Sequence, residues 1–241
     1  SKILEKASAD VQVLEKKISK AQEDYYEIMN KSQTGGFTSD AEIAAAATQL
    51  GAQPGELRYV DVNGDGNIDF SGDTDKTLIG SPIPNVTMGL NIGASYKGID
   101  FSAFFYGSFG NDILRNYERQ TPLANLLAYR IDRWTGEGSS SDPRLTTGSN
   151  RNGVLSDFYV EDGSYVRLKN LQLGYTLPSE LSKKAGFDKC RLYVAANNLF
   201  TLTGYRGYDP DLGSASPVVA GVDYGFYPQA RSYMFGMNLT F

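Results

Sequence analysis

The chain has 241 residues, with 28 acidic and 23 basic side chains and a net charge of −5, so it lacks the positive surface that a nucleic-acid partner requires. It contains no histidine and a single cysteine, Cys190, which excludes histidine-based triads, histidine-bound zinc and an internal disulfide framework. No apolar run reaches the roughly 18 residues of a transmembrane helix.

Residues 1–32 carry apolar side chains at a spacing of three or four residues, which predicts an amphipathic helix. These side chains are Leu4, Ala7, Val11, Leu14, Ile18, Ala21, Tyr25 and Ile28. Such a helix normally packs on a neighbouring element or partner, and a specific oligomerisation role is the alternative.

Residues 33–83 are expected to form a loop region with one short helix. Ser39 and Glu42 have the spacing of a capping box, and an alanine-rich stretch follows them. The sequence therefore predicts a helix that starts after Ser39 and ends at Gly51.

The stretch DVNGDGNIDFSGDTDK, residues 61–76, resembles a calcium-binding loop. Asp61, Asn63 and Asp65 match positions 1, 3 and 5 of an EF-hand loop, and Gly66 matches the glycine at position 6. Gly72 stands where the final carboxylate belongs, but removing Phe70–Gly72 as an insertion places Asp75 there. The expected ligands of a structural calcium ion are Asp61, Asn63, Asp65, Asn67, Asp69, Asp73 and Asp75. The alternative is an Asx-rich turn that satisfies its own backbone and binds no metal.

From residue 84 the apolar pattern changes to a period of two, which predicts β-strands. The clearest case is Val86–Tyr96, where apolar side chains alternate with small or polar ones over a length that would cross a membrane. Four further strands are predicted, and near Asn170 the alternation slips, which indicates a bulge. These four lie in IDFSAFFYGSFG, SYVRLKNLQLGYTLP, CRLYVAANNLFTL and RSYMFGMNLTF.

The connections between these predicted strands alternate between short and long. Residues 97–98 and 178–188 are short, whereas 111–163 and 203–230 are long. This alternation is typical of an outer-membrane barrel with periplasmic turns and extracellular loops. Five strands cannot close a barrel, so residues 84–241 are expected to supply an antiparallel, up-and-down transmembrane portion of a larger one.

Other candidate residues have ordinary structural readings. Asp209 and Asp211 in GYDPDLG could imitate a glycosidase pair, but their loop favours turn residues. Trp134, Tyr129 and Arg133 could stack on a sugar, or could pack the helix predicted in PLANLLAYRIDRW. Cys190 is expected to be an inert, packed thiol.

Several stretches together resemble the C-terminal part of the SusC/RagA family of TonB-linked outer-membrane transporters. They are PGELRYVDVNGDGNID, TLIGSPIPNVTMGLNIGASYKGIDFSAFFYGSFGNDI, RWTGEGSSSDPRL, SYVRLKNLQLGYTLP, NLFTLTGYRGYDPD and VDYGFYPQARSYMFGMNLTF. The match runs in order from about Gly36 to Phe241, whereas residues 1–32 do not resemble the family. Family barrels are of the plugged, 22-stranded type, of which this segment would supply roughly the last quarter.

The resemblance implies import of glycan or peptide oligomers across the Gram-negative outer membrane, with no catalysis. It implies a SusD-type surface lipoprotein as partner, and TonB acting through a part outside these residues. A soluble calcium-binding β-sandwich that serves adhesion or carbohydrate binding is the alternative function. A glycoside hydrolase fragment is a second rival, and the sequence offers it no convergent carboxylate pair.

Overall fold

The computed structural model describes residues 29–30, 36–117, 127–139, 142–145, 152–213 and 220–241. The chain divides into two compact units, one built on a long sheet and one built from the preceding segment and parts of two long loops. The predicted helix of residues 1–32 lies outside the described residues except at its end. There Met29–Asn30 is the short strand β1, paired with β2 (Lys76–Thr77), so these two residues are not helical.

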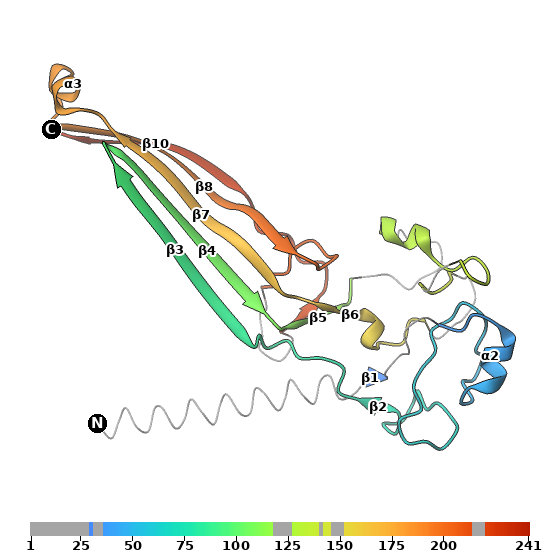
Figure 1. Cartoon of the computed structure of the whole chain (residues 1–241). Coiled ribbons are helices and arrows are strands. Elements are labelled where there is room, and N and C mark those ends of the chain that lie inside the picture. The colour runs from blue at the N-terminus through green and yellow to red at the C-terminus, as the bar shows by residue number, and fades with distance from the viewer. Residues whose placement is uncertain (1–28, 31–35, 118–126, 140–141, 146–151, 214–219) are drawn as a thin grey trace, which may run out of the picture. The chain divides into compact units, whose positions relative to one another are not determined.

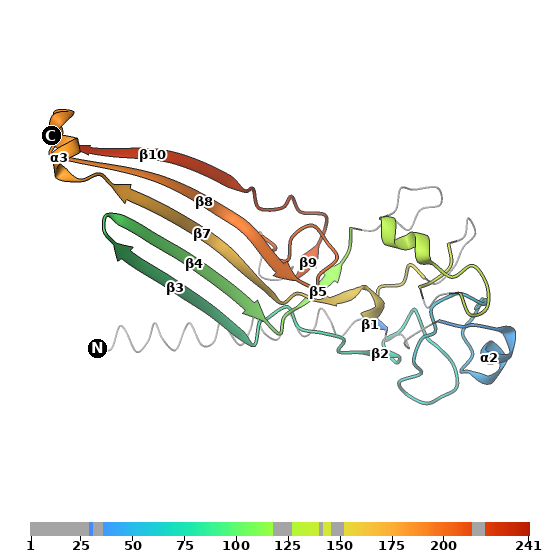
Figure 2. The same cartoon turned by 45° about the horizontal axis from the view of Figure 1, so that its top comes forward.

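The sheet unit holds five antiparallel strands in the spatial order β10-β8-β7-β4-β3 (Figures 1 and 2). Each long strand is hydrogen-bonded to the next long strand along the chain, so the predicted antiparallel, up-and-down arrangement is confirmed. The strands are β3 (Val86–Tyr96), β4 (Ile99–Phe109), β7 (Tyr165–Thr176), β8 (Lys189–Thr203) and β10 (Ser232–Thr240).

The short connections lie at one end of the sheet, as predicted. Lys97 and Gly98 join β3 to β4 with positive φ angles of 47° and 85°, the signature of a type I′ hairpin turn. The β7–β8 connection holds the short helix α3 (Ser179–Lys184) at that same end, and Phe241 ends the chain there (Figure 1). Both long connections leave the opposite end.

The bulge predicted near Asn170 is confirmed. Leu168 pairs with Phe105 and Asn170 with Phe104, so Lys169 is an extra residue on β7. On β8 the extra residues lie between Asn197 and Phe200, where Asn198 has a φ of 52°. Bulges shift the side-chain alternation, which is why the apolar pattern of β7 changes phase at this point.

The second unit is held together by small apolar clusters and short strands. Three of these strands form a sheet in the order β6-β5-β9. They are β5 (Asp112–Arg115), β6 (Val160–Asp162) and β9 (Val222–Asp223). One cluster contains Leu114, Tyr159 and Val222, and another contains Leu57, Tyr59 and Ile68. The described parts of residues 113–161 thus belong to one compact unit with the segment before Pro82, whereas the predicted division at residue 83 had placed them with the strands.

Two predicted helices are shorter than expected. Ser39 caps α2 (Asp40–Ala45) as predicted, and Glu42 accepts a hydrogen bond from the Thr38 amide at 2.7 Å. The helix does not reach Gly51, because Thr48 forms a bridge with Asn67 and its amide donates to the Gly66 carbonyl at 2.8 Å. In 122–134 the described residues hold only the 3₁₀ helix η1 (Ala128–Asp132). A second 3₁₀ helix, η2, spans Asp157–Tyr159.

Candidate functional site

One face of the five-stranded sheet, here called the apolar face, carries no charged side chain. Side chains alternate between the two faces along each strand, and directly paired residues share a face, so the strand registers define its members. Apart from Gly107, they are Val86, Met88, Leu90, Ile92, Ala94, Tyr96, Ile99, Phe101, Ala103, Phe105, Phe109, Val166, Leu168, Leu171, Leu173, Tyr175, Cys190, Leu192, Val194, Ala196, Phe200, Leu202, Tyr233, Phe235, Met237 and Leu239.

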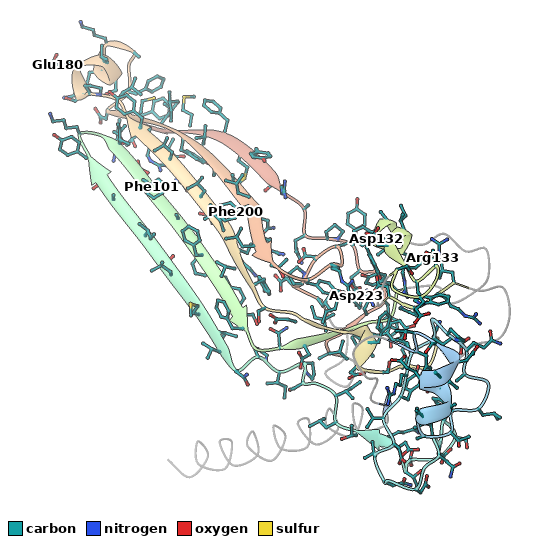
Figure 3. The ribbon with its side chains drawn as sticks, turned by 45° about the vertical axis from the view of Figure 1, so that its right-hand side comes forward. Phe101, Asp132, Arg133, Glu180, Phe200 and Asp223 are labelled. Carbon is teal, nitrogen blue, oxygen red and sulfur yellow. The ribbon has the colours of Figure 1, made fainter. Side chains whose placement is uncertain are left out.

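The apolar face is largely exposed, although its side chains are large and hydrophobic. Leu90 is 56% exposed and Phe235 75%, and Figure 3 labels Phe101 and Phe200, two further members. Water-facing surfaces of monomeric proteins rarely hold contiguous apolar patches larger than a few hundred Å². A face of this composition across five strands therefore calls for an apolar environment.

The opposite face, here called the polar face, carries mostly amides, hydroxyls, charged groups and small residues, together with Phe104 and Met234. Asn170, Asn197 and Ser232 form a hydrogen-bonded ladder across β7, β8 and β10. The Asn170 amide donates to Asn197 Oδ1 at 2.9 Å, and the Asn197 amide donates to Ser232 Oγ at 3.0 Å. Confinement of all charged side chains of the sheet to one face matches a sheet with lipid on one side and water on the other.

An ion pair on the polar face bridges β4 and β8 near the short-turn end. Arg191 donates to both carboxylate oxygens of Asp100, at 2.9 and 2.5 Å. The pair crosses β7 directly above Gly174, where an added Cβ would lie 2.5 Å from the Arg191 and Asp100 side chains. Only glycine at this position leaves room for the two-pronged contact.

A second charged group, here called the Arg167 clamp, ties the loop after β8 to the polar face. Arg167 is 1% exposed and donates to Thr201 Oγ1 at 2.8 Å. It forms ion pairs with Asp209 and, at 3.2 Å, with Asp211. Asp209 also accepts hydrogen bonds from the Gln229 and Asp211 amides, at 2.8 and 2.9 Å, and so joins both ends of the 204–231 loop. The two aspartates are structural, as their turn context predicted.

A buried arginine also organises the second unit. Arg115 is 1% exposed and lies over the rings of Tyr129, Phe158 and Tyr159 at 5.3–5.7 Å. It forms an ion pair with Glu161 at 3.0 Å. Tyr129, considered above for sugar stacking, thus packs against Arg115. Trp134 packs against the Gly55 backbone, where an added Cβ would lie 2.4 Å from its ring. Both aromatic rings therefore have packing roles in the structure.

In the acidic loop of residues 61–76, aspartate side chains accept hydrogen bonds from the backbone amides of the same loop. Asp61 accepts from the Gly64 and Gly66 amides, both at 2.7 Å, and the buried Asp75 accepts from Val62 and Asp69 at 3.0 and 2.6 Å. Hydrogen bonds from the Gly72 and Ser71 amides lower the pKa of Asp69 to about 2. Hydrogen bonds from Asn63 and Asn67 lower the pKa of Asp65. The carboxylates of Asp65 and Asp69 are therefore held in the charged form by local donors.

The seven expected calcium ligands are only partly brought together. Asp75 accepts a hydrogen bond from the amide of Val62, the residue after Asp61, whereas Asp73 forms an ion pair with Lys76 at 2.8 Å. Among the described residues, no group of three or more acidic or cysteine side chains is arranged to hold a metal ion. Calcium binding stays a prediction.

Sequence reasoning missed the partners of Arg167 and Arg115. Arg167 and Asp209 are 42 residues apart, and neither lies in a recognisable motif. For Arg167, the only signal in the sequence was its position on a predicted strand, on the face opposite the apolar side chains.

None of the helices in the described part of the chain has the length and hydropathy needed to cross a membrane.

Comparison with known proteins places the chain among bacterial receptors. It is 37% identical over 227 residues to TonB-dependent receptor P3 of Formosa agariphila, which covers 90% of this chain and 22% of that protein. It is 32% identical to receptor P26 of the same organism (86% and 22% covered). It is 30% identical to TonB-dependent receptor SusC of Bacteroides thetaiotaomicron (78% and 18% covered). No family model matches the chain.

Solved structures agree with these relatives. The RagAB peptide transporter matches with a TM-score of 0.65 and 26% identity, and the RagAB peptide importer in the closed-closed state with a TM-score of 0.64 and 27% identity. Each match covers 88% of this chain and 22% of the solved chain. The chain spans about a fifth of the length of the relatives that it matches.

Proposed function

We propose, from the premise that this chain belongs to the SusC/RagA family of TonB-dependent outer-membrane receptors and corresponds to its C-terminal part, that it forms a section of the wall of a transport barrel. The observation that carries this proposal is the exposed apolar face, which lacks any charge across five strands. The apolar face would meet lipid and the polar face would line the lumen. The chain would take no part in covalent chemistry.

The two unpaired edges of the sheet are evidence that it belongs to a larger barrel. β3 and β10 are the outermost strands of the five, so each has one row of backbone groups that no strand of this sheet pairs. Unpaired backbone groups are too costly in lipid, and closed barrels remove them. Strands outside this chain would therefore pair with β3 and β10.

The β-sandwich alternative lacks support. A sandwich buries the apolar face of each sheet under a second sheet, whereas here Leu90, Phe235 and their neighbours are exposed. The glycoside hydrolase alternative gains no support from Asp209 and Asp211, because both carboxylates form ion pairs with Arg167.

The relatives also support the proposed transport role. The RagAB peptide importer and the TonB-dependent receptor SusC support import by the whole transporter of peptide oligomers or, as the family resemblance implies, glycan oligomers. Import would be energised by TonB through a part of the protein outside this chain. A SusD-type surface lipoprotein would be the partner on the loop side. In the barrel, the short turns would face the periplasm and the long loops the exterior, and by the same strand order the acidic loop would lie outside.

The test is uptake by the intact transporter. The full-length protein, expressed with its neighbouring lipoprotein in a host with and without TonB, should accumulate labelled oligosaccharide or peptide only when TonB is present. Uptake that is independent of TonB, or a protein recovered from the aqueous fraction of cells rather than from outer membranes, would contradict the proposal.

We also propose a structural calcium ion in the acidic loop. Its support is the alternation of oxygen-bearing side chains at Asp61, Asn63, Asp65, Asn67 and Asp69. Calcium binding would require Asp61 and Asp65 to turn partly away from the backbone amides that donate hydrogen bonds to them. The affinity should therefore be weak, with a dissociation constant of about 10⁻⁴–10⁻³ M as in extracellular sites.

Limited proteolysis of the intact transporter checks the calcium proposal. Millimolar calcium should slow cleavage in the 61–76 segment relative to a chelator, because a bound ion holds the loop closed. The variant Asp61→Asn/Asp65→Asn should lose this protection, and Asp132→Asn, at the exposed end of η1, should keep it. Equal cleavage with calcium and with chelator would mean that the loop is a self-satisfied turn.

A further inference from the structure

The polar face of the sheet is electrically neutral between its two ends. Apart from Lys189 at the first residue of β8, each charged side chain on this face forms an ion pair with an opposite charge. Arg191 pairs with Asp100, Lys169 pairs with Asp211 at 3.1 Å, and the Arg167 clamp engages Asp209 and Asp211. Three positive charges therefore face three negative ones, and the sum is zero.

The three cations are further covered by aromatic rings. Arg191 lies 5.1 Å from the ring centre of Tyr193, Lys169 lies 4.6 Å from that of Tyr106, and Arg167 lies 5.4 Å from that of Tyr165. A cation that has both a carboxylate partner and a ring beside it has little remaining attraction for another anion. Apart from Lys189 at the first residue of β8, the polar face of the sheet thus offers a passing carboxylate or sulfate no cation without a carboxylate partner.

The remaining hydrogen-bonding groups are uncharged. The ladder of Asn170, Asn197 and Ser232 crosses three strands, and the next row towards the short turns places Gln172 beside Ser102 on β4. Each asparagine of the ladder is only partly buried, and an amide has two donor hydrogens and two acceptor lone pairs. These amides can therefore form further hydrogen bonds with a ligand that both donates and accepts them.

We propose that the polar face is a contact surface for a neutral oligosaccharide, with the amides of Asn170, Asn197 and Gln172 as its contacts. This inference rests on the proposed function, in which the polar face lines the lumen. Sugar hydroxyls donate and accept as the amides do. A charged peptide or an acidic glycan would lose hydration of its charged groups on contact with the polar face, and no ion pair would compensate for that loss.

The test measures binding and uptake by the full-length transporter in outer-membrane vesicles. The ligands are neutral gluco-, galacto-, manno- and xylo-oligosaccharides, uronic-acid oligosaccharides and charged peptides. Neutral oligosaccharide should bind most tightly. Asn170→Leu/Asn197→Leu should weaken it about tenfold, since two neutral hydrogen bonds are lost. Gln172→Leu, which leaves the ladder intact, should weaken it less but measurably. Leu171→Ile, at the same height on the apolar face, should change nothing.

The outcomes separate this inference from the proposed function. Tightest binding of a peptide or a uronic-acid oligosaccharide overturns the inference and leaves TonB-driven import standing. The same holds if a neutral oligosaccharide binds but neither the ladder variant nor Gln172→Leu alters its affinity. If no oligomer of any class is taken up, the proposed function fails and this inference fails with it.

Discussion

Replacing Arg167 with methionine should lower the free energy of unfolding by about 3–5 kcal/mol, the cost of removing one partner from a buried ion pair. Arg167 is 1% exposed, and its loss would leave Asp209, itself 7% exposed, as a buried charge without a cation. Because Asp209 also holds the Gln229 amide, both ends of the 204–231 loop should loosen together. Urea unfolding of the full-length protein in lipid vesicles measures the change.

Lys169→Met is the matched control for the Arg167 prediction. Lys169 shares Asp211 with Arg167, but the Lys169 and Asp211 side chains are 34% and 29% exposed, so this pair should contribute no more than about 1 kcal/mol. The combined variant Arg167→Met/Asp209→Leu should recover part of the loss, because it removes both buried charges. Equal destabilisation by Arg167→Met and Lys169→Met would show that burial does not set the strength of the clamp.

Replacing Leu90 with arginine should destabilise the protein in lipid by about 2–4 kcal/mol, the cost of an arginine near the middle of a membrane. Leu90 lies at the centre of β3 on the apolar face and is 56% exposed, so its side chain loses little packing within the chain. In an aqueous protein, a substitution at so exposed a site would fall within about 0.5 kcal/mol. The size of the effect therefore reports directly on the surroundings of the apolar face.

Asn91→Arg provides the matched control, since Asn91 is the next residue along β3 and points to the polar face. Its effect on unfolding in the same vesicles should stay below about 1 kcal/mol, because a lumen-facing arginine keeps its water. If Leu90→Arg and Asn91→Arg cost the same, the two faces of the sheet share one environment, and the lipid assignment fails.

The strands could be predicted from sequence because the pattern that identifies them is local. Val86–Tyr96 alternates without interruption, and the slip near Asn170 marks the bulge at Lys169 before any pairing is known. The start of α2 was also local, since Ser39 caps it with its own side chain. Its end was not, because it depends on the hydrogen bond between Thr48 and Gly66 in the acidic loop.

The groups that hold the loops could not be predicted, because their partners are distant in sequence. Asp209 looked like a turn residue, and only the fold brings it to Arg167. Glu161 reaches Arg115 across 46 positions of the chain, counted from the residue numbers. Charges carry no periodicity that reveals such pairings, whereas the hydrophobic pattern of a strand records which face is buried in lipid or protein.

Collision rates of nitroxide labels placed one at a time at residues 86–96 of the full-length protein in lipid vesicles test the central claim most directly. The account predicts alternation along β3. Labels at Val86, Met88, Leu90, Ile92 and Ala94 should collide mainly with oxygen, which concentrates in lipid. Labels at Thr87, Gly89, Asn91, Gly93 and Ser95 should collide mainly with a water-soluble nickel chelate. Collision with the nickel chelate at every position, without alternation, would contradict a membrane-spanning sheet.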